Sequence, residues 1–278
     1  MKQYEIVEKT VLTDTIFRMS VFAPQIAAKV RPGQFVILKK DVYGERIPLT
    51  VADYNVTNGT VTVIFQAVGA STIGFSMLNI GDAFCDFVGP LGKPSELDGY
   101  KKVAVIGGGL GCAIAYPQAK YLFANGAEVD LICGFRSKDL IILEEEMRAA
   151  STTLTILTDD GSNGNRGLVT DGLKAKIEAG ANYDLVIAIG PPVMMKFVSI
   201  LTKSYEIPTI VSMNPIMIDG TGMCGGCRVT VGGEMKFACV DGPDFDGHLV
   251  DFDELIRRNK MYQREEREQS CRLLSQKK

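Results

Sequence analysis

The first hundred residues alternate apolar and polar positions with a period of two, the pattern of strands that bury one face. Segments rich in β-branched and aromatic residues are separated by Pro-Gly, Asn-Gly and Gly-Asp pairs, which are typical of turns. The segments that we expect to be strands are residues 11–22, 34–39, 47–53 and 60–67. Short strands at this spacing predict a small antiparallel β-barrel over residues 1–98.

The pattern changes after residue 101, where short apolar runs begin to alternate with helical periodicity. A helix is expected to end at Asn125-Gly126, and further helical patterns cover residues 140–149 and 193–205. The expected strands are residues 103–106, 129–133, 154–157, 185–189 and 209–212. Strands that alternate with helices predict an α/β domain with a doubly wound parallel sheet over residues 99–212.

Composition and charge argue against several classes of protein, among them nucleic-acid-binding, membrane and secreted proteins. The chain has 278 residues, of which 46% are hydrophobic and 23% charged, and a net charge of -3 gives no reason to expect a nucleic-acid or anionic-membrane partner. No apolar run approaches the roughly 18 residues of a membrane span, and the N-terminus turns polar too soon for a signal peptide. We therefore expect a cytoplasmic protein. His248 is the only histidine, so histidine acid–base catalysis is not favoured.

The candidate metal ligands lie in and shortly after the glycine-rich segment that begins at Asp219. Asp219, Cys224, Cys227 and Cys239 have the plant-type [2Fe–2S] spacing, with aspartate in place of the first cysteine. Glycines between them let the backbone approach a cluster closely. A zinc knuckle and incidental buried cysteines are the alternatives, although zinc usually pairs two C-x2-C units, or one such unit with two histidines. Asp219 is expected to be the fourth ligand, or else to cap the loop by accepting backbone N–H bonds.

This segment predicts a [2Fe–2S] module over residues 213–248, followed by a C-terminal helix over residues 249–278. Five side chains of the helix fall on one stripe, and four of them are apolar. They are Phe252, Leu255, Ile256, Asn259 and Tyr262. The stripe either docks on a partner subunit or packs on the chain's own cluster module.

A glycine-rich loop follows the first expected strand of the α/β domain and opens a helix. Gly107, Gly109 and Gly111 suit a loop whose free N–H groups and helix N-terminus bind a pyrophosphate, although Cys112 replaces the last glycine of the usual motif. A purely structural glycine turn is the alternative. The strand–loop–helix context favours a dinucleotide site.

Three further residues are candidates for the same nucleotide site. Asp160 and Gly190 follow expected strands, at the edge where an open α/β sheet binds ligands. Arg136 stands where an acidic residue usually contacts the ribose, so it could bind a 2′-phosphate or cover the adenine. These residues leave the choice between NAD and NADP open.

The barrel carries two short motifs that suit a flavin nucleotide. Arg46 can pair with a phosphate, and the Thr50 hydroxyl could reach the flavin near its N5 atom, although a surface arginine is the plain alternative. The second motif precedes a helical stretch over residues 73–78, whose N-terminus can bind the other phosphate. The candidate flavin-binding residues are Arg46, Pro48, Leu49, Thr50, Gly69, Ser71 and Thr72.

The order of barrel, R-x-x-x-T, G-x-S-T and glycine-rich α/β domain resembles the ferredoxin–NADP⁺ reductase superfamily. With the cluster module added, the whole chain resembles the electron-transfer subunits of type B dihydroorotate dehydrogenase. Asp219 and the tail from Phe245 onward closely resemble the small subunits of related electron-bifurcating ferredoxin:NADP⁺ transhydrogenases, and similar chains have been labelled sulfide dehydrogenase subunits.

This resemblance implies an oxidoreductase subunit that binds FAD, NAD(H) and a [2Fe–2S] cluster. Hydride would pass between NAD(H) and FAD, and single electrons would pass through the cluster to a larger partner that carries FAD and [4Fe–4S] centres. Ferredoxin and NADP(H) would react at that partner, and the isolated chain would act as a diaphorase. The alternatives are an electron-transfer subunit of dihydroorotate dehydrogenase or of a hydrogenase, and a zinc-binding module without catalytic activity.

Overall fold

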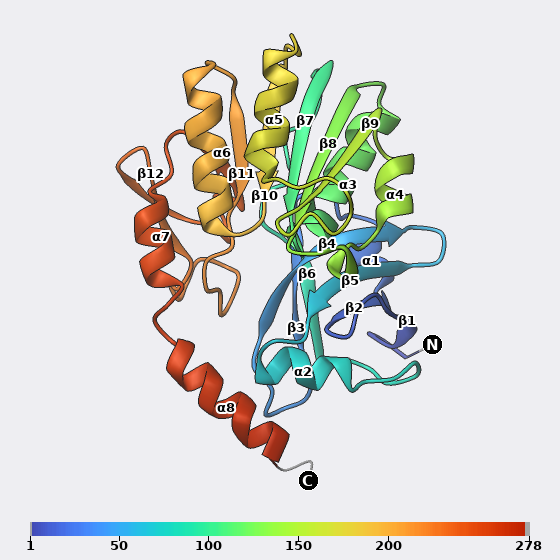
Figure 1. Ribbon diagram of the computed structural model, residues 1–278. Helices are drawn as coiled ribbons and strands as arrows, with labels where there is room; N and C mark the ends of the chain where they lie inside the picture. The colour runs from blue at the N-terminus through green and yellow to red at the C-terminus, as the bar shows by residue number, and fades with distance from the viewer. Residues whose placement is uncertain (1, 276–278) are drawn as a thin grey trace.

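The N-terminal sheet of the computed structural model, which describes residues 2–275, has six antiparallel strands in the order β1-β2-β5-β4-β3-β6 (Figure 1). A bridge between Glu5 and Ala83 joins segments next to the two outermost strands, so the sheet closes into the expected barrel. The strands are β1 (Ile6–Val11), β2 (Ile16–Phe22), β3 (Phe35–Lys39), β4 (Ile47–Asn55), β5 (Thr60–Gln66) and β6 (Asp86–Leu91).

Two details of the barrel differ from the sequence prediction. Residues 11–22 do not form one strand, because the Thr13 hydroxyl accepts the N–H groups of Thr15 and Ile16 and turns the chain between β1 and β2. The strand β6 was not predicted. It contains Gly89 and Pro90, which favour turns in most sequences, and proline lacks the N–H that a central strand would use.

Short helices complete the barrel. They are α1 (Pro24–Ala27) and α2 (Ala70–Ser76). Phe75 of α2 is 1% exposed and contacts Phe65 and Phe84 edge to face, with ring centroids 5.9 and 5.2 Å apart. This aromatic cluster fixes the position of α2, and with it the second flavin motif at the start of that helix.

The second sheet has six strands in the order β14-β11-β10-β7-β8-β9. Five strands are parallel, as expected from the alternation of strands and helices, and β14 pairs antiparallel with β11 at the edge. The strands are β7 (Lys102–Gly108), β8 (Glu128–Phe135), β9 (Thr153–Thr158), β10 (Leu185–Ile189), β11 (Thr209–Ser212) and β14 (Asp244–Asp246). Because β14 follows the cysteine-rich segment in sequence, the cluster module and the parallel sheet share a core.

Helices cover both faces of this sheet. Leu122 and Met147 pack α3 and α4 on one face, and Leu173 and Met195 pack α5 and α6 on the other, which lies in front in Figure 1. The helical elements are α3 (Gly111–Ala124), the 3-10 turn η1 (Lys138–Leu140), α4 (Glu144–Ala149), α5 (Val169–Glu178) and α6 (Pro192–Ser204). The prediction of one helix over residues 140–149 is wrong in its first turn, and α5 was not predicted.

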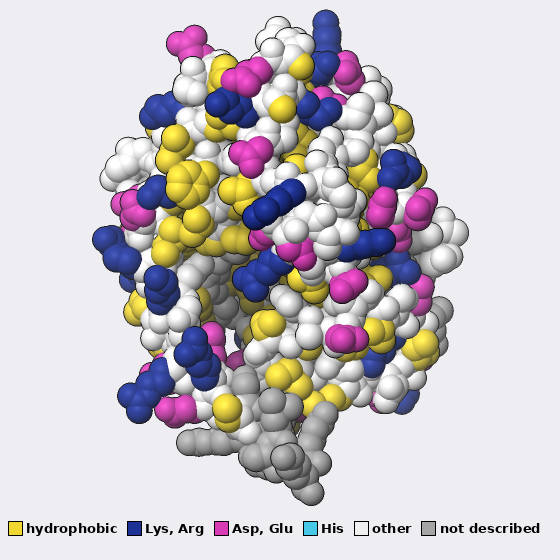
Figure 2. Space-filling view, viewed as in Figure 1, with side chains coloured by type: hydrophobic (Ala, Val, Ile, Leu, Met, Phe, Trp, Pro, Cys, Tyr) yellow, Lys and Arg dark blue, Asp and Glu magenta, His cyan; other side chains and the backbone are white. Residues whose placement is uncertain are grey.

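The outer face of α6 carries an exposed apolar stripe. Val193, Phe197 and Ile200 are 50%, 56% and 55% exposed, and Figure 2 shows hydrophobic side chains gathered over this helix. Among residues 2–275, no helix combines the length and the hydrophobicity that a membrane span needs.

The C-terminal part consists of a hairpin and two helices. They are β12 (Arg228–Val231), β13 (Glu234–Phe237), α7 (Phe252–Arg258) and α8 (Gln263–Ser275). Phe252 and Leu255 are 5% and 1% exposed in the core that they share with β12 and α6, so these two residues pack on the chain's own module. They cannot form a stripe that docks on a partner. The helix α8 continues away from α7 and contacts α2 of the barrel (Figure 1).

Candidate functional site

A cavity of about 580 Å³ lies between the barrel and the carboxyl edge of the parallel sheet. Five of the residues that the sequence predicts for cofactor binding line it together. They are Thr50, Gly109, Gly111, Arg136 and Gly190. The barrel and the parallel sheet therefore form one cleft, with the flavin motif on one wall and the dinucleotide motif on the other.

The glycine-rich loop is shaped by close approaches that exclude side chains. A Cβ on Gly111 would lie 2.4 Å from the carbonyl oxygen of Ile189, and one on Gly107 would lie 2.8 Å from Sγ of Cys112. Gly109 has a φ of +55°, and its N–H donates to Gly134 over 2.8 Å. As a result α3 begins directly against β10, and its N-terminus faces the cavity, which suits a pyrophosphate.

Arg136 lines the cleft, and the backbone of Asp160 contacts Arg136, although Asp160 is not among the residues that line the cleft. The N–H of Asp160 donates to the carbonyl oxygen of Arg136 over 3.3 Å. The side-chain and backbone hydrogen bonds from Ser162 lower the pKa of Asp160, so its carboxylate is ionised at neutral pH. An anionic acceptor at this position could bind ribose hydroxyls.

The cavity also contains residues that sequence reasoning missed. Gln66 is the last residue of β5 and Ser212 is the last residue of β11, which Met213 and Asn214 follow. The last three stand at the carboxyl end of a parallel strand, the same signal that identified Asp160 and Gly190. Nothing in the sequence around Gln66 marks it, because its place in the cleft depends on how the barrel meets the sheet.

The first flavin motif lies at the start of β4. Thr50 faces the cavity, whereas Leu49 packs against the barrel core. Pro48 shares the face of Thr50, since side chains alternate along a strand. Arg46 forms an ion pair with Asp86 over 3.4 Å, at the edge of the barrel. The roles of these residues in flavin binding stay predictions.

The second flavin motif surrounds the start of α2. The Thr72 hydroxyl accepts the N–H groups of Val68 and Gly69, so it caps the helix. The Ser71 hydroxyl donates to the carboxylate of Glu45 over 2.8 Å. Glu45 must move aside if Ser71 is to bind a phosphate, since the two anions would compete for one donor.

Two of the predicted cluster ligands are already adjacent in the structure. The Sγ atoms of Cys227 and Cys239 lie 3.2 Å apart, and both residues are buried. A tetrahedral centre with metal–sulfur bonds of about 2.3 Å places two thiolates roughly 3.7 Å apart, so a small adjustment fits one metal ion. Burial and the hydrogen bond with Cys227 raise the pKa of Cys239 to about 12, and metal binding must therefore displace its proton.

The other two predicted ligands are exposed and belong to one loop. Sγ of Cys224 accepts the N–H of Gly226 over 3.4 Å. Both carboxylate oxygens of Asp219 accept backbone N–H groups, from Thr221 and from Cys224, each over 2.7 Å. These bonds hold the pKa of Asp219 below its usual range. The structure thus shows Asp219 capping the loop, and ligation by Asp219 stays a prediction.

The glycines of the loop let its backbone come close to a bound cluster. Gly220, Gly222 and Gly225 have φ values of +77°, +85° and +65°, and a Cβ on Gly220 would lie 2.5 Å from Ile37 of the barrel. One thiol pair and one exposed pair across a glycine loop suit the two irons of a [2Fe–2S] cluster.

The fold and the site define a flavoprotein reductase of the ferredoxin–NADP⁺ reductase type that carries an iron–sulfur module. Residues 214–251 match the family model of the iron–sulfur cluster binding domain of dihydroorotate dehydrogenase B. The chain belongs to the family of dihydroorotate dehydrogenase B electron-transfer subunits and their homologues, because a homologue of that subunit from Thermotoga maritima is 44% identical over 95% of this chain and 93% of its own length.

Two further comparisons agree with this family. An uncharacterized protein from Clostridium beijerinckii is 54% identical over 95% of this chain and 92% of its own length. A solved structure of an NADH-dependent reduced ferredoxin–NADP oxidoreductase, described in the context of flavin-based electron bifurcation, is 42% identical with a TM-score of 0.94. That match covers 99% of both chains.

These similarities confirm the coarser predictions. The protein is an oxidoreductase electron-transfer subunit with the expected barrel and parallel sheet. FAD, a [2Fe–2S] cluster and NAD(H), the three cofactors predicted from the sequence, agree with its family and with the matched iron–sulfur domain.

Proposed function

We propose that the chain is the subunit that exchanges hydride with NAD(H) in an electron-bifurcating ferredoxin:NADP⁺ transhydrogenase. The observation that carries this proposal is the contact between the cluster loop and the barrel. Gly220 packs against Ile37 of β3 and Leu91 of β6, and β3 pairs with β4 through Phe35 and Thr50. The cluster loop therefore contacts a strand that neighbours the strand of the flavin motif, which suits short-range electron transfer.

When bound, FAD would supply hydride chemistry with NAD(H), and the cluster would supply single-electron transfer. The residues of the chain bind and orient these groups. The N-terminus of α3 would hold the dinucleotide pyrophosphate, the Thr50 side of the cleft would face the flavin, and the carboxylate of Asp160 would bind the ribose hydroxyls of NAD(H). No proton donor is required at the cleft for the hydride step.

The partner is proposed to be a larger subunit with FAD and [4Fe–4S] centres, where ferredoxin and NADP(H) react in the cytoplasm. Exposed apolar side chains around the cluster loop support a docking face there. Ile218, Met223 and Val240 are 54%, 90% and 43% exposed. They form a collar around the loop, since Cβ atoms on Gly222 and Gly226 would approach Val240 and Ile218. An apolar collar would exclude water between the cluster and its redox partner.

A second candidate is an electron-transfer subunit of dihydroorotate dehydrogenase itself, which the family model of the cluster domain favours. That model covers 38 residues by its bounds 214–251, whereas the similarity to the ferredoxin–NADP oxidoreductase extends over 99% of the chain. Asp219 also occupies a position where the dihydroorotate dehydrogenase subunits resembled by this sequence normally have cysteine. The transhydrogenase is therefore the function that we propose.

Native co-purification followed by assays of the complex tests the proposal. We expect a larger flavin and iron–sulfur subunit, NADH- and ferredoxin-dependent reduction of NADP⁺, and no oxidation of dihydroorotate. A higher kcat/KM for NADPH than for NADH in the diaphorase reaction of the isolated chain would contradict the assignment of NAD(H) to this subunit. Met223→Ser should weaken the complex, whereas Phe197→Ser on the exposed stripe of α6 serves as the matched control.

A further inference from the structure

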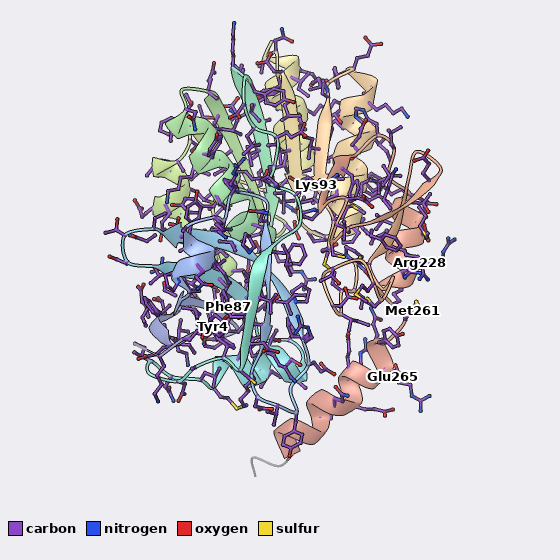
Figure 3. All side chains as sticks on the ribbon, turned by 180° about the vertical axis from the view of Figure 1, so that it is seen from behind. Tyr4, Phe87, Lys93, Arg228, Met261 and Glu265 are labelled. Atoms are coloured by element: carbon purple, nitrogen blue, oxygen red, sulfur yellow. The ribbon has the colours of Figure 1, made fainter. Side chains whose placement is uncertain are left out.

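Two arginines hold the peptide groups that lie between the predicted ligands Cys224 and Cys227. Nη1 of Arg228 donates to the carbonyl oxygen of Gly225 over 2.9 Å, and Nη2 of Arg258 donates to that of Gly226 over 3.1 Å. Arg228 starts β12 directly after the loop, and Figure 3 shows it at the cluster module. Arg258 reaches the loop from the end of α7. Two guanidinium groups thus converge on two consecutive glycines.

The first of these bonds acts on a sulfur atom through one peptide group. The carbonyl oxygen of Gly225 and the N–H of Gly226 belong to the same peptide, and that N–H donates to Sγ of Cys224 over 3.4 Å. A charged donor on the carbonyl oxygen fixes the peptide plane and polarises its N–H. Hydrogen bonds to ligand sulfurs are among the factors that set the reduction potential of an iron–sulfur cluster.

The position of Arg258 is fixed by the core. Phe252 and Leu255 bury the inner face of α7, and the side-chain amide of Asn259 donates to the carbonyl oxygen of Asn214, a residue that lines the cleft. The side chain of Arg258 is partly buried, and its Nε atom is buried without a hydrogen-bond partner among the described residues. Solvent and salt screen such a charge less than an exposed one.

From this geometry we propose that Arg228 and Arg258 are positioning residues that raise the reduction potential of the cluster, an inference that rests on the proposed function. The cluster gains one electron and no proton when it accepts charge from the reduced flavin. Positive charge and polarised N–H groups next to its ligands stabilise the more negative, reduced form. Arg258 contributes more than Arg228, because Arg228 is exposed to solvent.

A redox titration of the purified, cluster-loaded protein tests this inference, with the EPR signal of the reduced cluster as the readout. Arg258→Gln should lower the equilibrium constant for cluster reduction about tenfold, which corresponds to about 59 mV for a one-electron couple. Arg258→Lys should restore part of the shift, and Arg228→Gln should give a smaller shift in the same direction. Arg257→Gln is the matched control, since Arg257 is exposed, adjacent and in the same last turn of α7.

The outcomes separate a specific effect from net charge and from loss of structure. Equal potentials in Arg258→Gln and Arg257→Gln would overturn the proposal. Iron content is measured first. If Arg258→Gln does not retain the cluster, Arg228→Gln becomes the deciding variant, and an unchanged reduction potential in Arg228→Gln would overturn the proposal. A wild-type chain that gives no reduced-cluster signal would refute the proposed function itself, together with this inference.

Discussion

Asp219 uses both carboxylate oxygens within its own loop, although its place in the spacing is that of a cluster ligand. The backbone N–H groups of Thr221 and Cys224 hold the carboxylate in its ionised form. An ionised carboxylate is also what ligation requires, so the loop prepares the group for either role. A carboxylate is a harder donor than a thiolate and suits ferric iron.

Substitution of Asp219 distinguishes a ligand from a cap. If Asp219 is a ligand, Asp219→Cys should retain the cluster with visible and EPR spectra moved toward those of an all-cysteine centre, and Asp219→Ala should lose iron. Iron analysis and EPR of the two purified variants measure this. Full iron content with an unaltered EPR spectrum in Asp219→Ala would show that Asp219 only caps the loop.

Arg46 is the cation that the barrel places beside the Thr50 strand, where it pairs with Asp86 over 3.4 Å. A charge-assisted phosphate contact contributes about 1.5–3 kcal/mol. Arg46→Ala should therefore weaken FAD retention about tenfold to a hundredfold, as measured by flavin occupancy after dialysis. Asp86→Asn is the control, because it releases the guanidinium and should leave FAD retention undiminished. Equal flavin occupancy in Arg46→Ala and wild type would remove Arg46 from the flavin site.

At the scale of elements, one buried carboxylate joins β8 to its neighbours. Asp130 is 4% exposed and accepts hydrogen bonds from Thr153 of β9, from Lys176 of α5 over 3.1 Å and from Tyr183 over 2.6 Å. Burial alone would raise the pKa of Asp130, but these three donors outweigh it and the pKa is lowered. Breaking such a network leaves buried donors without a partner.

The sign of the pH dependence follows from this lowered pKa. The stabilisation by Asp130 is fully present above the unfolded-state pKa of about 3.9 and is lost as the pH falls through the lower folded-state pKa. We expect Asp130→Asn to lower the free energy of unfolding by about 1–3 kcal/mol at pH 7. The difference from wild type should shrink below about pH 4. Glu178→Gln, which breaks an exposed ion pair with Lys174, should change stability by less than about 0.5 kcal/mol. Urea unfolding at several pH values measures these free energies. A difference between Asp130→Asn and wild type that does not change with pH would contradict the expected role of the carboxylate.

The C-terminal helices have separate roles because only α7 is buried. Truncation after Val250 removes Phe252 and Leu255 from the core and should destabilise the protein by about 4 kcal/mol or more. Truncation after Tyr262 removes only α8, whose described side chains are exposed, and should leave the melting temperature nearly unchanged. Thermal melting of both truncated chains compares them directly. Similar melting temperatures would show that α7 is not part of the core.

For the whole molecule, the sequence predicted both sheets and the residues of the cleft that carry a motif, because periodicity and glycine spacing are local signals. It could not predict that β14 joins the parallel sheet, since Asp244–Asp246 is three residues long and its pairing with β11 spans the entire cluster module. Gln66 was missed for a related reason, because its place in the cleft depends on how the barrel meets the sheet. Contacts between segments that are distant in sequence produce no periodic pattern of residues from which they could be predicted.

The barrel, the parallel sheet and the cluster module meet in one region of the molecule. The cleft opens between the barrel and the parallel sheet, and the loop after β11 leads from Asn214 at the cleft into the cluster module. Gly220 then brings that module back onto the barrel at Ile37. The cleft, the cluster loop and the barrel strands that carry Ile37 and Thr50 are therefore contiguous.

On the proposed function, NADH reduces the cluster through the flavin of this one chain. Anaerobic addition of NADH to the purified, cofactor-loaded protein tests this transfer. Flavin bleaching should be accompanied by the EPR signal of a reduced [2Fe–2S] cluster, and Cys227→Ser with Cys239→Ser should abolish the signal while bleaching persists. The opposite result is a wild-type protein that shows flavin bleaching with NADH but a reduced-cluster signal only with dithionite. That result would show that NADH does not reduce the cluster through this flavin.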